Sequence, residues 1–412
     1  MFRKRSFNFQ TEVLTSHIGG SYMIPENYDH RRHAYIKHVL LRQYLKILFP
    51  IIGRHQDVIW YVDCFAGPWQ VEEDDTNLEG TSISISINIM RECQEFLRKT
   101  FNKRVVFKAL YVEKDPDSYL RLQEYLSKIK YQDLHLYSLN GEFYNLRGEI
   151  LKTIGDTEFA FFFIDPKGWK QSIEIPTLKP LLKRNNAEFL INFMYLFINR
   201  NYSAKIFNEQ LKEVFGSEPT ECHLCPEERE KYLINQYRDY LKSMELSENN
   251  ELRTAYVSIL DPQKDRTKYH LVYVTRHPLG IIKFFEVSEN IDLVQSLVRE
   301  QTKQERLEEK TGQMPLFAPS VNVVEKDKPY SLSDIKEFLL SLLEIEEILF
   351  GINEMAEILE KKGWFISEVE KAFLQLEEDG KVRNLDAKGK RKKHPIHYED
   401  NNHRGERIVR LK

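Results

Sequence analysis

The chain has 412 residues, 42% of them hydrophobic and 30% charged, and a formal net charge of −3 at pH 7. These values are ordinary for a globular protein and exclude a general electrostatic attraction to nucleic acid, so any basic surface has to be local. The sequence holds no apolar run of membrane-spanning length and no signal-peptide pattern, so we expect a cytoplasmic protein. Four cysteines are too few for a disulfide framework.

Apolar strand segments alternate with helical segments through the first half of the chain, after a helix predicted over residues 28–49. Strands are predicted at 58–62, 103–112, 134–139, 158–164 and 187–197, with helices at 81–98, 116–129, 145–154 and 175–184. This alternation predicts an α/β fold with a parallel sheet. Residues 200–253 are interpreted as a charged helical insertion. Strands at 254–260 and 269–275 follow without a long crossover, which predicts an antiparallel hairpin at the sheet edge and seven strands in all.

The remaining chain is predicted to form a second domain. We assign residues 1–300 to the α/β domain, 301–330 to a polar linker containing Gly312 and several prolines, and 331–412 to the second domain. In this last part, helices at 331–349, 353–362 and 367–379 precede strands at 381–385 and 407–411. Three helices and a β-hairpin predict a winged helix.

The loop between the last two strands is strongly basic. Residues 381–412 carry 11 lysines and arginines against 4 acidic residues. A basic loop of this kind contacts phosphates, so we predict a nucleic-acid contact there. The residues concerned are Lys388, Lys390, Arg391, Lys392 and Lys393. The third helix of the domain is acidic, which makes the loop the stronger candidate contact. A winged helix that binds protein remains the alternative.

Three predicted strands of the first domain end in acidic residues. Asp63 ends the first, Glu113 the second and Asp165 the fourth. The carboxyl ends of parallel strands meet at one edge of the sheet, where open α/β sheets bind nucleotides. Each acid taken singly could instead cap the next helix. The three together could also bind Mg²⁺, as in a nuclease.

Neighbouring residues favour a nucleotide-like ligand over a metal. The turn Phe65-Ala66-Gly67 lets the backbone approach a ligand closely, because glycine lacks a Cβ. Glu113 is placed to accept the two hydroxyls of a ribose. After the third strand, Asn140 or Glu142 is within reach of an adenine amino group. The sequence therefore predicts a nucleotide-type cofactor along this edge and no metal.

Two motifs resemble those of a known enzyme class. The run Val62-Asp63-Cys-Phe-Ala-Gly67 resembles the S-adenosylmethionine loop of Rossmann-like methyltransferases, usually D-x-F-x-G-x-G. The run Phe163-Ile-Asp165-Pro-Lys-Gly-Trp169 resembles the D/N-P-P-Y/F/W region of amino methyltransferases. The resemblance implies a Rossmann-like methyltransferase sheet, S-adenosylmethionine as cofactor, Asp165 as the group that holds an acceptor amine, and Trp169 as the ring that stacks on a flipped base.

The whole chain also resembles one narrower family, the three-Cys-motif partner (TcmP) family. The similarity covers residues 35–48, the loop from Asp63 to Pro68, the Asp165–Trp169 motif, the stretch His277-Pro-Leu-Gly280 and the C-terminal domain. The family is bacterial and archaeal. It implies a partner protein with three cysteines that resembles radical-SAM proteins.

Two departures from the methyltransferase pattern leave the function open. Trp69 stands near the position of the motif's last glycine, and Lys167 replaces the second proline of the acceptor motif. We therefore keep two hypotheses. The first is an S-adenosylmethionine-dependent methyltransferase acting on a base amine of nucleic acid. The second is an inactive methyltransferase relic that recognises nucleic acid or protein for a three-Cys partner.

Cys222-His-Leu-Cys225 is the chain's one CxxC motif. A tetrahedral zinc site needs two further ligands at suitable spacing, and the sequence offers neither a second CxxC nor an HxxxH motif. We interpret these cysteines as incidental thiols in a helix-loop segment.

Overall fold

The structure is a computed structural model, and it describes residues 24–25, 28, 31–67, 80–218, 224–244, 251–312, 330–343, 347–389, 391 and 393–411. Most of the predicted linker, 313–329, lies outside these ranges, together with five residues named in the sequence predictions: Pro68, Trp69, Cys222, Lys390 and Lys392. Among the described helices, none is both long enough and apolar enough to cross a lipid bilayer.

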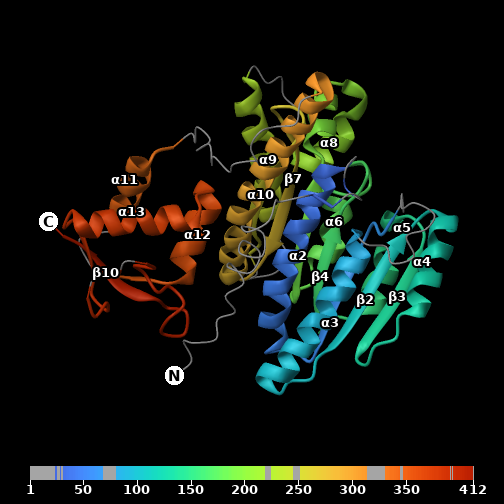
Figure 1. Ribbon diagram of the computed structural model, residues 1–412, viewed down its shortest axis with the longest axis horizontal. Helices are drawn as coiled ribbons and strands as arrows, with labels where there is room; N and C mark the ends of the chain where they lie inside the picture. Colours follow the sequence, from blue (N-terminus) through green and yellow to red (C-terminus); the bar gives the residue numbers. More distant parts are fainter. Residues whose placement is uncertain are drawn as a thin grey trace.

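Helices and strands alternate from the first described helix as far as the fifth strand (Figure 1). In chain order the elements are α2 (Arg32–Gly53), β1 (Val58–Asp63), α3 (Ser82–Phe101), β2 (Val106–Glu113), α4 (Pro116–Lys128), β3 (Leu134–Asn140), α5 (Phe143–Ile154), β4 (Phe159–Ile164), α6 (Ile175–Leu182) and β5 (Ala187–Phe193). They are followed by α7 (Tyr195–Asn201), η2 (Lys205–Phe207), α8 (Asn208–Phe215), α9 (Pro226–Lys242), β6 (Arg253–Leu260), β7 (Thr267–Thr275) and α10 (Pro278–Thr311).

These strands form one sheet of seven, in the order β3-β2-β1-β4-β5-β7-β6. Strands β1 to β5 are parallel, and β7 runs antiparallel to both β5 and β6. The predicted parallel sheet with a terminal antiparallel hairpin is thus confirmed. Strand order reverses between β1 and β4, and this switch point is where ligands bind open α/β sheets.

The central strands are apolar along their whole length because helices cover both faces of the sheet. All six residues of β4 and all seven of β5 are buried. Helices α2, α3, α4 and α10 share a core with one face, and α5, α6, α8 and α9 share a core with the other. Figure 1 shows α2 and α3 lying across the sheet. Within the range 200–253, the described helices α8 and α9 help to close the second face.

Several boundaries differ from the prediction, and three of these differences change the description of the fold. Helix α10 has 34 residues and reaches Thr311, so residues 301–311 are helix and not linker. This polar part of α10 is held by Arg32 of α2, whose Nη1 donates to Thr302 Oγ1 at 2.7 Å. Strand β5 ends at Phe193, and α7 begins two residues later. Local composition predicts that these segments are helix or strand. Their exact ends depend on contacts with residues far away in the sequence, which composition does not show.

The third difference lies in the C-terminal part. Its elements are α11 (Leu332–Leu342), β8 (Ile348–Phe350), α12 (Ile352–Lys362), α13 (Ile366–Glu378), β9 (Val382–Asn384) and β10 (Glu406–Arg410). The helix predicted at 331–349 is therefore shorter, and the unpredicted strand β8 follows it. The three strands form an antiparallel sheet in the order β8-β10-β9.

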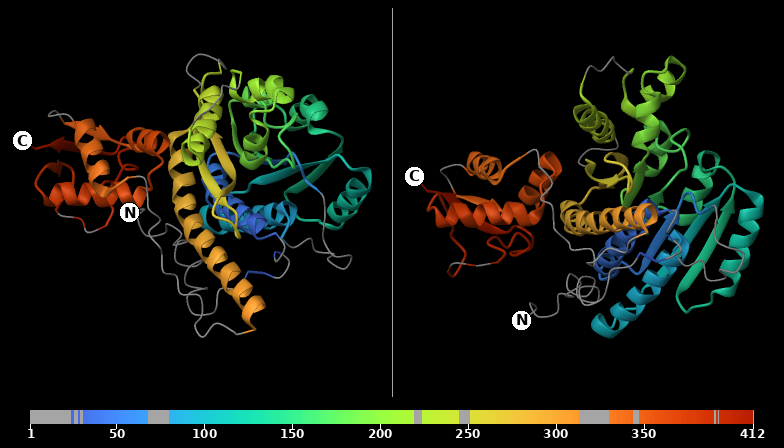
Figure 2. Two further views of the ribbon diagram at one scale, coloured as in Figure 1. Left: turned by 90° about the horizontal axis from the view of Figure 1, so that it is seen from above. Right: turned by 45° about the horizontal axis from the view of Figure 1, so that its top comes forward.

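The C-terminal elements pack beside α10 (Figure 2). Arg238 of α9 donates from Nη2 to the carbonyl oxygen of Glu360 at 2.8 Å, and Lys283 of α10 pairs with Glu399 at 2.7 Å. Buried residues of α12 and α13 belong to the same apolar core as α2 and α10. The two parts of the chain are therefore joined by both polar and apolar contacts.

The stretch His277–Gly280 connects β7 to α10. The His277 ring accepts from the Leu279 N–H at 3.2 Å and so caps the helix. A Cβ at Gly280 would lie 2.4 Å from the Tyr273 hydroxyl oxygen, which itself contacts Tyr44 at 2.6 Å. This motif thus has a packing role where α10 crosses β7.

Candidate functional site

A cavity of about 510 Å³ opens at the carboxyl ends of β1, β4 and β5. Its walls include Phe65, Ala66 and Gly67 from the loop after β1, Asp165 from the end of β4, and Asn192 from β5. The cavity therefore lies at the switch point between β1 and β4, and the two sequence motifs meet there.

The buried side chain of Asp63 forms a hydrogen bond with the loop after β1. It is fully buried, and its Oδ2 accepts from the Ser82 hydroxyl at 2.6 Å while its Oδ1 accepts from the Phe65 N–H at 3.2 Å. Burial raises the pKa of Asp63 to about 7, although both hydrogen bonds act in the opposite direction. The Tyr61 hydroxyl also donates to Oδ2 at 3.5 Å, and all three donors are uncharged, so no cation contacts this buried acid directly.

Gly67 and Glu113 are in close contact. Glu113 is buried at the end of β2, and its Oε1 accepts from the Asp115 N–H at 2.8 Å. A Cβ at Gly67 would lie 1.4 Å from Oε2 of Glu113, so a larger residue here would displace the Glu113 carboxylate. Glu113 therefore lies directly behind the loop and is not part of the cavity wall.

Asn140 and Glu142 lie beside Glu113 and outside the cavity wall. Asn140 is paired with Glu113 in the strand register, and its Nδ2 donates to the Glu113 carbonyl at 2.8 Å. Glu142 precedes α5 and makes an ion pair with Lys114 at 3.5 Å. The structure brings these two residues to the predicted edge, next to Glu113.

Asp165 makes two contacts that the sequence did not predict. Its Oδ2 pairs with Lys37 of α2, and its Oδ1 accepts from Asn192 Nδ2 at 2.7 Å. Asn192 is 3% exposed, and its Oδ1 has no hydrogen-bond partner among the described residues. Lys37 is buried and lines the cavity, although a lysine on a helix is usually expected to face solvent. Only the packing of α2 on the sheet reveals this.

Trp169 does not reach the cavity. Its ring is 3% exposed and packs edge-on against Phe207, with ring centroids 5.9 Å apart. The stacking role predicted for Trp169 does not fit this arrangement, because the second helical layer covers the ring. A different aromatic residue, Phe197 of α7, lines the cavity and is 47% exposed.

The cavity wall is rich in cations. Six lysines and arginines line it against two carboxylates, Asp165 and Asp261. The basic residues are Arg31, Lys37, Lys167, Arg200, Arg266 and Lys268. The lining residue His33 adds no charge at neutral pH, because burial and the nearby Lys268 lower its pKa to about 4. The cavity therefore favours an anionic ligand even though the chain as a whole is acidic.

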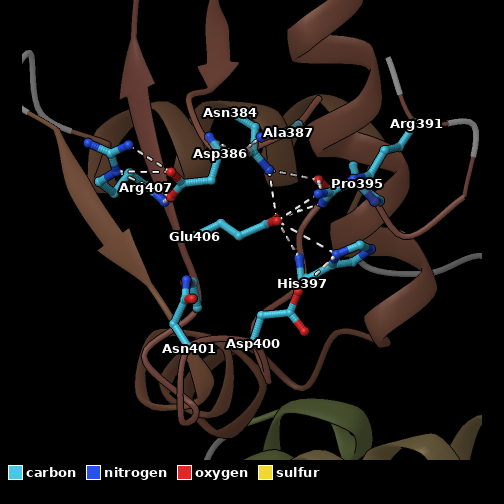
Figure 3. A network of polar contacts seen from close by, with 11 residues as sticks. Asn384, Asp386, Ala387, Arg391, Pro395, His397, Asp400, Asn401, Glu406 and Arg407 are labelled. Carbon is cyan, nitrogen blue, oxygen red and sulfur yellow. Dashed lines mark hydrogen bonds and ion pairs between the residues drawn. The ribbon is translucent and has the colours of Figure 1, made fainter. Parts of the chain in front are cut away.

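The basic C-terminal loop is organised around Glu406 (Figure 3). Both Glu406 oxygens accept from Arg391 at 2.7 Å, and Asn384 Nδ2 and the His397 N–H each donate to Oε2 at 2.8 Å. The prediction that Arg391 contacts phosphate conflicts with this pairing, since its guanidinium is already engaged. Lys388 and Lys393 are exposed.

Only one described group of side chains could hold a metal ion. It consists of His397, Asp400 and Glu406, whose candidate ligand atoms lie within 4.8 Å of one another. Arg391 already neutralises Glu406, which makes this a poor cation site. Within the described chain, Asp63, Glu113 and Asp165 do not form such a group, so the arrangement does not favour the Mg²⁺ alternative.

The chain matches no family model and no curated protein. Similar solved structures include a Legionella pneumophila protein of family model DUF519, with 10% identity and a TM-score of 0.36 over 63% of this chain and 92% of that one. A Geobacter metallireducens precorrin-6y C5,15-methyltransferase has 12% identity and a TM-score of 0.24 over 56% and 84%. A loganic acid methyltransferase with SAH has 9% identity and a TM-score of 0.25 over 73% and 96%. The fold assignment rests on strand order and direction, because likenesses at this level add nothing to it.

Proposed function

We propose that the protein is an S-adenosylmethionine-dependent methyltransferase that acts on a base amine of nucleic acid. The observation that carries the proposal is the meeting of the loop after β1 and Asp165 in one cavity at the β1/β4 switch point. Each motif alone is common in α/β proteins. Their convergence gives a donor region and an acceptor region side by side.

The sequence motifs assign the residues behind and around the loop to the cofactor. Glu113 would hold the ribose, Asn140 or Glu142 the adenine, and the loop from Asp63 to Gly67 the methionine part. The cofactor's sulfonium supplies an activated methyl group. The protein's task is then to align donor and acceptor and to exclude water.

Asp165 and Asn192 would hold the acceptor. The unpartnered Asn192 Oδ1 can accept one N–H of an exocyclic amine. The Asp165 carboxylate has lone pairs left beyond its contacts with Lys37 and Asn192, so it can accept the other. Two accepted hydrogen bonds would direct the nitrogen lone pair toward the methyl donor.

For the C-terminal part we propose a winged helix that contacts nucleic acid. The order of α11, β8, α12, α13, β9 and β10 and the sheet order β8-β10-β9 support this assignment. Lys388 and Lys393 would contact phosphates, while Arg391 would shape the loop through Glu406.

Titration calorimetry with S-adenosylmethionine tests the proposal. We expect the wild type to bind and Asp63→Ala to lose binding, because the loop loses its Phe65 and Ser82 contacts. Asp57→Ala is the matched control, since Asp57 precedes the same strand at its opposite end and is 84% exposed. Absence of binding by the wild type would refute the enzyme proposal.

One observation favours the second hypothesis, a relic that serves a three-Cys partner. Lys37 and Asn192 already engage both oxygens of Asp165, the group that an acceptor amine would need. The test is to incubate the protein with a labelled methyl donor and DNA or RNA, with and without the partner. Label transfer supports the enzyme. Cofactor binding without any transfer supports the relic.

A further inference from the structure

Helix α7 presents an aromatic ring and a cation on one side, at the cavity. Phe197 and Arg200 are three residues apart in α7, which places them on neighbouring positions of one helix face. Both are exposed and both line the cavity. Phe197 therefore offers the exposed aromatic ring that was expected from Trp169. Trp169 itself is buried under the second helical layer.

The cations of the cavity fall into two groups. Lys37 is paired with Asp165, Arg266 with Asp261 at 3.2 Å, and Lys268 lies 3.0 Å from His33 Nδ1. By contrast, neither Lys167 nor Arg200 makes an ion pair with any residue that the structure describes. Lys167 follows Asp165 and Pro166 in the loop after β4. Together with Arg200 it therefore provides a second cation without an ion pair among the described residues, on the side of the cavity that contains Asp165.

We propose that this cavity takes single-stranded nucleic acid, with a base stacked on Phe197 and the adjoining phosphate held by Arg200 and Lys167. Aromatic rings beside cations are the usual means of binding single strands, because every base has a face to stack and every nucleotide a phosphate. The inference rests on the proposed function and adds the strand form of the substrate and the residues that hold it. It also gives Lys167, which departs from the methyltransferase motif, a role in substrate binding.

The test measures strand binding without any cofactor, so it stands apart from the calorimetry. The probe is a fluorescently labelled thymidine oligonucleotide of about 12 nucleotides, and the readout is fluorescence anisotropy with the full-length chain. We expect Phe197→Ala to weaken binding about ten-fold through the lost stacking. Phe101→Ala is the matched control, because Phe101 is 45% exposed on α3 and lies outside the cavity wall.

Salt titration tests the phosphate contacts. Arg200→Gln and Lys167→Gln should each reduce the slope of log affinity against log salt concentration by about 0.7, the value for one phosphate of a single strand. Lys152→Gln on α5 is the control, since this lysine is exposed and is not part of the cavity wall. The proposal fails if the cavity variants change binding no more than these controls do.

Competition identifies the source of the nucleotide. We expect adenosine monophosphate, at the same concentration of bases as the oligonucleotide, to leave the labelled strand bound. Its displacement would show that the cavity recognises free nucleotides and would overturn the strand proposal. Failure of strand binding with normal S-adenosylmethionine binding would overturn this inference alone.

Discussion

Two buried carboxyl groups in this protein have opposite electrostatic environments. Asp63, behind the cavity loop, accepts hydrogen bonds from a hydroxyl and a backbone N–H, and burial raises its pKa to about 7. Glu406, in the C-terminal sheet, is buried too, but Arg391, Asn384 and His397 lower its pKa to about 2. One carboxyl is left without a cation and the other is fully compensated.

The difference supports the proposal that the region of the cavity, and not the Glu406 network, binds a ligand. Uncompensated buried acids are costly, and they concentrate at functional sites where a ligand supplies the missing charge. S-adenosylmethionine carries a sulfonium and an ammonium group, which would offset the charge of Asp63. By contrast, the Glu406 carboxylate is already paired with residues of its own chain, so we assign this network a structural role.

The largest effect is expected from the pH dependence of Asp63. Its folded-state pKa lies above the ordinary 3.8, so its stabilising contribution is complete below pH 4 and disappears as the pH rises through 7. Asp63→Asn should remove this dependence, worth about 4 kcal/mol for a shift of about three pKa units. Urea unfolding of both proteins at pH 4 and pH 8 measures nearly the whole of this difference. Parallel behaviour of wild type and variant would show that Asp63 is compensated like Glu406.

The contribution of Glu406 to the free energy of unfolding should show the reverse pH dependence, with a size of about 3 kcal/mol. Its folded-state pKa lies below the ordinary 4.5, so its contribution is present above pH 5 and lost as the pH falls toward 2. We expect Glu406→Gln to be less stable at pH 7 and to lack this acid transition. Asp386→Asn is the control, because Asp386 pairs with the more exposed Arg407 and such surface pairs contribute little. Equal losses in the two variants would contradict the structural role of the Glu406 network.

A smaller effect is expected at Gly67. Gly67→Ala forces the Glu113 carboxylate away from the Asp115 N–H, which should cost about 1–3 kcal/mol and weaken cofactor binding. Gly148→Ala in α5 is the control, because a Cβ there meets nothing within 4 Å and should stabilise the helix slightly. Thermal unfolding compares the two variants. Equal stability of both would mean that Glu113 moves freely behind the loop.

The sequence by itself determined the elements and the edge of the sheet that matters. Apolar runs such as Phe159–Ile164, which are short and bounded by turn residues, indicate strands covered on both faces, and their regular separation by helices favours a parallel sheet. That sheet then brings the ends of β1, β2 and β4 to one edge. Asp63, Gly67, Glu113 and Asp165 could therefore be placed there from their positions in the chain alone.

Only the tertiary structure decided which side chains face the cavity and which are already paired. Lys37 and Asn192 reach Asp165 from elements far apart in the sequence, Trp169 is covered by the layer containing Phe207, and Arg391 is neutralised by Glu406. Periodicity describes how one element is built, whereas these contacts depend on how separate elements pack. The orientation and pairing of each side chain therefore follow from long-range contacts that no local pattern encodes.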